Sequence, residues 1–169
     1  MNKYTSYIII LFALIGCSDD TPEVLPPPLG QSFYLLDKDG DDLLDPQSEK
    51  AIDAKKINIY YLVNGERIEA NRYFLMLNFP TLNYGFGITA PNSANNKSHY
   101  YINIALNQSG NNGDTLYTYV EWNENDIDTI KSKIYKKGKV FDCTMVAYND
   151  SVWTPNQLEN RTIFTIIKP

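Results

Sequence analysis

From Gln31 to the C-terminus, apolar and aromatic residues alternate with polar residues at a period of two. This alternation is typical of β-strands that bury one face against a core. No helical pattern competes with it, because the best helix candidate, Gln47–Lys56, suffices for a couple of turns at most. The pattern therefore predicts strands over 32–36, 57–63, 72–78, 100–106, 115–122, 127–135, 140–147 and 161–168.

Short polar turns separate these runs. Asn64-Gly65 predicts a tight hairpin, and Asn123-Glu124-Asn125 predicts a turn between two strands. About eight or nine short strands at such spacing predict an all-β domain, an antiparallel immunoglobulin-like β-sandwich. A closed barrel is the alternative, because the number of strands does not separate the two architectures.

The N-terminal stretch has a different composition. Lys3 precedes the apolar run Tyr7–Ile15, and the acidic and proline-rich stretch 18–30 follows. The run is shorter than the roughly 20 apolar residues that span a bilayer, so it predicts a signal peptide. The expected organisation is a signal peptide over 1–16, an extended tether over 17–30 and a single β-sandwich domain over 31–169.

Leu14-Ile15-Gly16-Cys17 resembles the lipobox of bacterial lipoproteins. The resemblance implies that Cys17 becomes the mature N-terminus and carries a thioether-linked diacylglycerol and an amide-linked acyl chain, which together anchor stably. Ser18-Asp19-Asp20 is similar to the acidic export signal of Bacteroidota lipoproteins, which implies the outer membrane and exposure on the cell surface. The periplasmic leaflet is the alternative location.

A second resemblance concerns the stretch Phe33–Pro46, which is similar to the opening segment of small Bacteroidota cell-surface lipoproteins of unknown function. Such proteins tend to be single β-sandwich domains. The resemblance therefore implies a fold and a location, and it implies no activity.

The charge of the chain bears on its partners. A formal net charge of −5 gives a nucleic-acid partner no electrostatic support. The most basic segment is Lys131–Lys139. We expect it to form a solvated hairpin edge whose charges oppose aggregation.

The segment with ligand chemistry is the acidic stretch Asp37–Pro46. Alternating carboxylates in a turn can converge on calcium, which takes six to eight oxygen ligands. The candidate ligands, which match four positions of the EF-hand loop, are Asp37, Asp39, Asp41 and Asp45. The loop departs from that template at Asp42, where glycine is expected, and at Ser48, where glutamate is expected. Aspartates that cap a solvated turn are the alternative interpretation.

Lipidation of Cys17 leaves Cys143 as the second and unpaired cysteine, so no disulfide is expected. Alternation places Cys143 on one strand face with Phe141, Met145 and Ala147, where a thiol behaves as a small apolar group. His99 is the sole histidine that could generate a thiolate. We therefore expect Cys143 to be buried and inert.

The sequence contains no GxSxG, HExxH, CxxC or P-loop motif. Glu121 with Tyr117 and Tyr119 imitates a carboxylate flanked by sugar-stacking rings. Trp122 and Trp153 are candidates for a glycan-stacking platform, and Trp153 is favoured because its neighbours predict a loop.

These observations predict a non-catalytic accessory or binding component, held at the membrane by acyl chains on Cys17 and binding a glycan or a protein. No enzyme activity and no required cofactor are expected. A structural subunit of a surface assembly is the alternative function, and a carboxylate-based hydrolase is the third.

Overall fold

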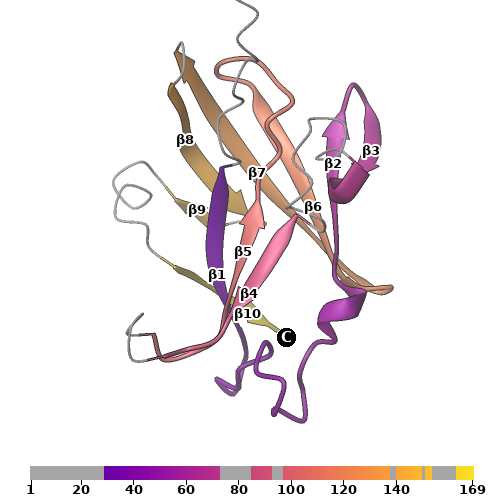
Figure 1. Ribbon diagram of the computed structural model, residues 1–169, viewed down its shortest axis with the longest axis vertical. Coiled ribbons are helices and arrows are strands. Elements are labelled where there is room, and N and C mark those ends of the chain that lie inside the picture. The colour runs from indigo at the N-terminus through magenta and orange to yellow at the C-terminus, as the bar shows by residue number, and fades with distance from the viewer. Residues whose placement is uncertain (1–28, 73–84, 93–96, 138–139, 150, 154–162) are drawn as a thin grey trace, which may run out of the picture.

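The computed structural model describes residues 29–72, 85–92, 97–137, 140–149, 151–153 and 163–169, and these are nearly all β (Figure 1). One 3-10 helix, η1 (Ala54–Lys56), precedes the second strand. The strands of the described residues are β1 (Gly30–Asp37), β2 (Asn58–Val63), β3 (Glu66–Glu69), β4 (Phe86–Thr89), β5 (Tyr101–Ala105), β6 (Thr115–Asn123), β7 (Asp126–Lys137), β8 (Val140–Tyr148), β9 (Ser151–Trp153) and β10 (Phe164–Lys168).

The strands form two sheets that pack as a sandwich, which confirms the predicted all-β sandwich. The four-stranded sheet has the order β10-β1-β5-β4, and the six-stranded sheet has the order β3-β2-β6-β7-β8-β9. One pair differs from the antiparallel expectation, because β1 and β10 run parallel with Phe33 opposite Phe164. Parallel partners need a long connection, and here nearly the whole domain lies between the two strands.

The core lies between the sheets and follows the predicted alternation. Phe33, Leu35, Ile102 and Ile104 face inward from the four-stranded sheet and are fully buried. The residues that face them from the six-stranded sheet are Ile59, Tyr61, Val120, Trp122, Ile130 and Val146. Each such side chain contributes about 1.5–3 kcal/mol by leaving water.

The β2–β3 hairpin confirms the turn predicted at Asn64-Gly65. Both residues have positive φ, 52° and 85°, as the tight turn that matches strand twist requires. The strand Glu66–Glu69 that follows was not predicted, because its alternation is too short to stand out.

Two predicted segments differ from the structure. Residues 70–72 are helical, so Arg72 does not begin a strand, and the remainder of the predicted strand 72–78 lies outside the described residues. Within the helix candidate Gln47–Lys56, the helical part is η1 alone. Asp53 caps it by accepting a hydrogen bond from Lys55 N at 3.0 Å.

The predicted face of β8 is wrong at Cys143. Ile134 lies opposite Cys143 but Lys133 lies opposite Met145, so Thr144 is an extra residue that forms a bulge. The bulge reverses the alternation, and Cys143 shares the core side with Val146 and Tyr148 rather than with Met145 and Ala147. The side chain of Phe141 lies outside the described part.

The expectation of a solvated hairpin edge at Lys131–Lys139 is also wrong. β7 lies inside the six-stranded sheet, between β6 and β8. Lys131 and Lys133 are exposed on its outward face, because the buried residues Ile130, Ser132 and Ile134 alternate with them.

The signal peptide, Cys17 and the tether to residue 28 lie outside the described residues. Within the described part, no helix has the length and apolar character needed to span a membrane.

Candidate functional site

The acidic loop follows β1 and is shaped by its own aspartates. Asp37 Oδ1 accepts hydrogen bonds from the backbone N–H groups of Asp39 and Asp41, both at 2.9 Å. Asp42 Oδ1 accepts one from Leu44 N at 2.9 Å. Aspartate side chains commonly close tight turns in this way. Two carboxylate oxygens of the loop, Asp37 Oδ1 and Asp42 Oδ1, are therefore already hydrogen-bonded to the loop's own backbone.

Lys50 places its ammonium among three of these carboxylates. Its Nζ lies 2.5 Å from Asp37 Oδ2, 2.8 Å from Asp41 Oδ2 and 3.4 Å from Asp39 Oδ2. The hydrogen bond from Lys50 holds the pKa of Asp37 below its ordinary value, and the bonds to Asp37 and Asp41 raise the pKa of Lys50. A cation of the chain itself thus occupies the position that the sequence assigns to calcium.

The fourth predicted ligand is elsewhere. Asp45 Oδ1 accepts a hydrogen bond from Gln47 N at 2.9 Å, in the following turn. No group of three or more His, Cys, Asp or Glu side chains has the arrangement of a metal site within the described part of the chain. Calcium binding here stays a prediction, and Asp37, Asp39 and Asp41 are the ligands that the fold brings together.

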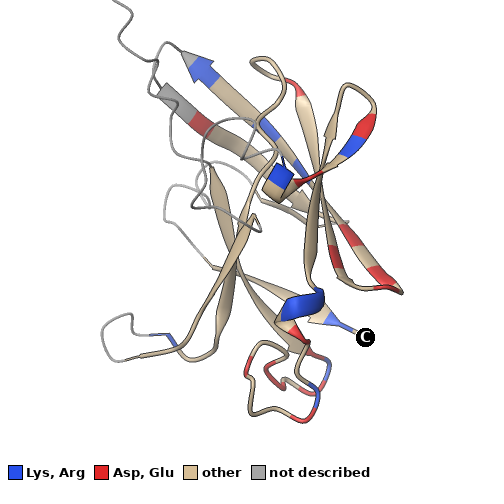
Figure 2. Cartoon of the chain, turned by 45° about the vertical axis from the view of Figure 1, so that its right-hand side comes forward, with Lys and Arg blue, Asp and Glu red and all other residues tan. Residues whose placement is uncertain are grey.

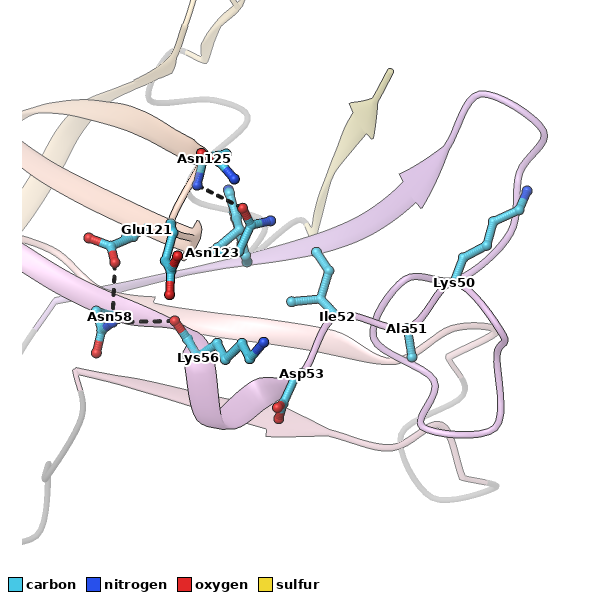
Figure 3. Close-up of a pocket in the computed structure, with 11 residues that line it drawn as sticks. Lys50, Ala51, Ile52, Asp53, Lys56, Asn58, Glu121, Asn123 and Asn125 are labelled. Carbon is cyan, nitrogen blue, oxygen red and sulfur yellow. Dashed lines mark hydrogen bonds between the residues drawn. The ribbon is translucent and has the colours of Figure 1, made fainter.

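A groove of about 720 Å³ lies beside the acidic loop, between residues 50–58 and the β6–β7 turn (Figure 3). Ile52 and Trp122 are the large apolar residues in its lining. The polar lining consists of Lys50, Asp53, Lys56, Asn58, Glu121, Asn123, Glu124 and Asn125. The volume lies within the range of small-ligand sites.

Hydrogen bonds hold two of the groove's amides in place. Asn58 Nδ2 donates to Lys56 O at 3.3 Å and to Glu121 Oε1 at 3.5 Å. Across the groove, Asn123 Oδ1 accepts from Asn125 N at 2.9 Å (Figure 3). The groove thereby offers positioned amides, carboxylates and the Lys56 ammonium to one ligand, whereas the Lys50 ammonium is held in the acidic loop.

The predicted trio Tyr117, Tyr119 and Glu121 shares the outward face of β6. The Arg67 guanidinium lies 4.7 Å from the ring centres of both Tyr60 and Tyr119. A sugar that stacks on Tyr119 must therefore displace Arg67, whereas Glu121 reaches the groove.

A buried network lies behind the groove at Trp122. The Trp122 indole donates from Nε1 to Asp128 Oδ2 at 2.7 Å, and the Tyr148 hydroxyl and the Lys168 ammonium donate to the same oxygen. Lys168 Nζ also binds both oxygens of Asp126, at 2.7 and 2.8 Å. Because Lys168 belongs to β10 and Asp126 to β7, this network joins the two sheets.

Burial by itself would raise the pKa of Asp128. Hydrogen bonds from Lys168, Tyr148 and Asn149 outweigh burial and hold that pKa below its ordinary value. The carboxylate is therefore ionised and fully partnered at neutral pH, which is the pattern of a structural charge.

Neither tryptophan presents an open platform. Trp122 is fully buried, so its predicted part in glycan stacking is wrong. Trp153 lies in the short strand β9 rather than in the predicted loop, and its ring stacks on Phe164 at 4.2 Å with 17° between the planes. Phe33 lies 6.0 Å from the Trp153 ring, and the side chain is half-buried against the core.

Cys143 and His99 have separate surroundings. Burial raises the pKa of the Cys143 thiol to about 11. His99 instead packs edge-on against Tyr34 at 5.7 Å, with Nδ1 3.8 Å from an Asp42 oxygen.

Sequence reasoning missed Lys50, Lys168 and the amides of the groove. The one local signal was the asparagine-rich turn at 123–125, which was interpreted only as a turn. Lys50 and Lys168 carry no signal, because no local pattern folds Lys50 back onto carboxylates 9 to 13 positions earlier, and Lys168 meets carboxylates 40 and 42 positions away.

Comparison of this chain with protein-family models, with curated proteins and with solved structures yields no match.

Proposed function

We propose that this chain is a lipid-anchored, non-catalytic binding component of the outer membrane that holds a small polar ligand in the groove beside the β6–β7 turn. The observation that carries the proposal is the groove itself, a ligand-sized hollow of about 720 Å³. The lipobox sequence at Cys17 and the acidic residues after it support the location.

The lining favours a polar ligand. Asn58, Asn123 and Asn125 offer both donors and acceptors, and the groove contains the Lys56 ammonium as well as carboxylates. Hydroxyl and amide groups of a ligand pair with such side chains, whereas a purely apolar ligand leaves them unpaired at a cost in affinity.

The lining also favours binding over catalysis. The described residues of the groove include no serine, cysteine or histidine for a hydrolase of the serine or cysteine type, so its catalytic candidates are carboxylates such as Glu121. Glu121 accepts a hydrogen bond from Asn58 and is not paired with a second carboxyl group in the described groove.

The test uses the purified full chain in a non-ionic detergent and a panel of monosaccharides, disaccharides and dipeptides, followed by thermal melting. At least one compound is expected to raise the melting temperature in a saturable manner, since binding to the folded state alone stabilises it. The double variant Asn58→Ala, Asn125→Ala should abolish that rise, and Lys38→Ala on the exposed loop should retain it. A panel without effect, or an effect that survives the double variant, contradicts the proposal.

A hydrolase would turn over a chromogenic substrate. Release of nitrophenol from nitrophenyl glycosides, lost on Glu121→Gln, would overturn the non-catalytic part of the proposal. The thermal shifts would still report on binding.

A further inference from the structure

The outward surface of the four-stranded sheet differs in chemistry from the rest of the molecule. Its polar side chains are Ser32, Tyr34, Thr89, Tyr101, Asn103 and Thr165, which alternate with buried residues on β1, β5 and β10 and with partly buried residues on β4. Gly87, Leu36 and Ile167 complete this surface, which we call the open face. Within the described residues, the open face bears no charged side chain.

The outward surface of the other sheet is charged. It carries Arg67, Glu69, Glu121, Lys131, Lys133 and Asp142. Figure 2 shows the contrast, with β4 and β5 free of charged residues while the six-stranded sheet carries bands of both signs. The chain as a whole contains 21% charged residues, so the open face is less charged than the sequence average.

Two tyrosines form the centre of the open face. Phe33 lies opposite Ile102 in the antiparallel β1–β5 pair, so Tyr34 and Tyr101 are the next neighbours across the strands. Both rings are half-buried, and His99 braces the Tyr34 ring edge-on at 5.7 Å. Thr165 flanks Tyr34 on β10, and Thr89 flanks Tyr101 on β4, so hydroxyl groups border the rings on both sides.

An amide beside the tyrosines is held flat against the sheet. Asn103 Nδ2 donates to Ser32 Oγ at 3.0 Å. Asn103 Oδ1 lies over Gly30, at 2.5 Å from where a Cβ would stand, so only glycine permits this position. Gly87, opposite Asn103 on β4, has open space above its Cα. The result is a surface with two half-buried tyrosine rings on one row and a hydrogen-bonded amide on the next.

We infer that the open face binds a neutral glycan chain, at a site separate from the groove of the proposed function. A charged ligand would lose water here without meeting an opposite charge, which disfavours it. A dry protein or lipid contact would leave hydroxyl and amide groups unpaired. A neutral glycan brings no charge that would stay unpaired, and its hydroxyl groups bind the Asn, Ser and Thr side chains of the open face. The faces of its sugar rings can stack on the tyrosine rings.

The test is native gel electrophoresis of the full chain in a non-ionic detergent, through gels that contain dextran, mannan, xyloglucan or hydroxyethylcellulose. Alginate and heparin serve as acidic probes. At least one neutral polymer is expected to retard the chain, and added sodium chloride should leave the retardation unchanged. Tyr34→Ala and Tyr101→Ala should each weaken retardation by about tenfold.

Matched variants separate the open face from the rest of the molecule. Tyr60→Ala removes a half-buried tyrosine from the outward face of the other sheet and should leave retardation intact, as should the groove variant Asn58→Ala, Asn125→Ala. Gly87→Glu introduces bulk and charge at an unobstructed position and should abolish retardation while the circular dichroism spectrum stays unchanged. That variant keeps the test valid if a tyrosine variant fails to fold.

Three results would overturn the inference. The first is no retardation by any neutral polymer. The second is retardation by alginate or heparin alone that salt abolishes. The third is retardation that Gly87→Glu and both tyrosine variants leave unchanged. Each leaves the groove proposal standing, because the thermal shifts with small ligands are measured independently.

Discussion

Lys50 is the residue that decides how the acidic loop is neutralised. Its ammonium contacts the carboxylates of Asp37, Asp41 and Asp39 at 2.5, 2.8 and 3.4 Å. Three carboxylates so close together repel one another unless a cation lies among them. A lysine in this place makes the folded loop independent of a bound metal, although the same oxygens are of the type that calcium prefers.

Replacement of Lys50 by methionine should therefore make the loop dependent on calcium. The melting temperature of Lys50→Met is expected to fall by a few degrees and to recover as calcium is added, while the parent chain responds less. Magnesium is the ion control, and Lys55→Met in η1 is the residue control. Identical melting curves for Lys50→Met and the parent at every calcium concentration would contradict this role.

The thiol of Cys143 should react slowly. With its pKa raised to about 11, the thiolate fraction at neutral pH is roughly two orders of magnitude below that of an ordinary cysteine. In the full chain carrying Cys17→Ala, Cys143 is the only thiol, so its reaction with Ellman's reagent can be followed directly. Fast reaction without denaturant would show that the side chain is accessible.

Strand β10 is attached by an ion-pair network as well as by strand pairing and burial. It pairs with β1 along one edge, and Lys168 at its end reaches across to Asp126 and Asp128 on β7. Lys168 also lies 5.2 Å from the Trp122 ring centre. This contact joins the two sheets at the end that bears the groove.

Loss of that contact should destabilise the sandwich. Lys168→Met is expected to lower the free energy of unfolding by about 2–4 kcal/mol, because it leaves a mostly buried carboxylate without its ion-pair partner. Lys131→Met, on the exposed face of β7, should change it by less than about 0.5 kcal/mol. Urea unfolding measures both, and equal values for the two variants would show that the buried pair contributes nothing.

The pH dependence of stability follows from the same carboxylate. Since the pKa of Asp128 is lowered in the folded chain, its contribution is present above the ordinary carboxyl pKa and is lost as the pH falls through the lowered value. Asp128→Asn should be less stable at neutral pH and should lose less stability on acidification than the parent. Urea titrations at successive pH values test this, with Asp142→Asn as the exposed control.

For the molecule as a whole, the predicted anchor determines where the binding surfaces act. Cys17→Ala removes the thiol that we propose is acylated, so the variant should leave the membrane fraction, whereas Cys143→Ser should remain there. Fractionation of cells followed by immunoblotting distinguishes the two. A Cys17→Ala chain that stays with membranes would require a different anchor.

The fold was predictable from sequence because alternation at a period of two is a property of neighbouring residues. The buried rows Ile59 and Tyr61, Ile102 and Ile104, and Val120 and Trp122 all follow from it. The hairpin at Asn64-Gly65 was equally local, since positive φ at both residues suits asparagine and glycine. Turn chemistry and alternation therefore identify the longer strands and their faces, apart from the bulge in β8, but they miss the short strands β3, β4 and β9.

The order of the strands and the partners of the charges depend on segments that are distant along the chain. No local pattern pairs β1 with β10 in parallel, inserts Thr144 as a bulge, or brings Lys168 to Asp128 across 40 positions. The sequence alone determined the β class and the core rows, because short-range sterics and burial govern them. Only the tertiary structure decided the cation in the acidic loop, the groove and the uncharged open face, because the path of the loop after β1 and the order of the strands bring those residues together.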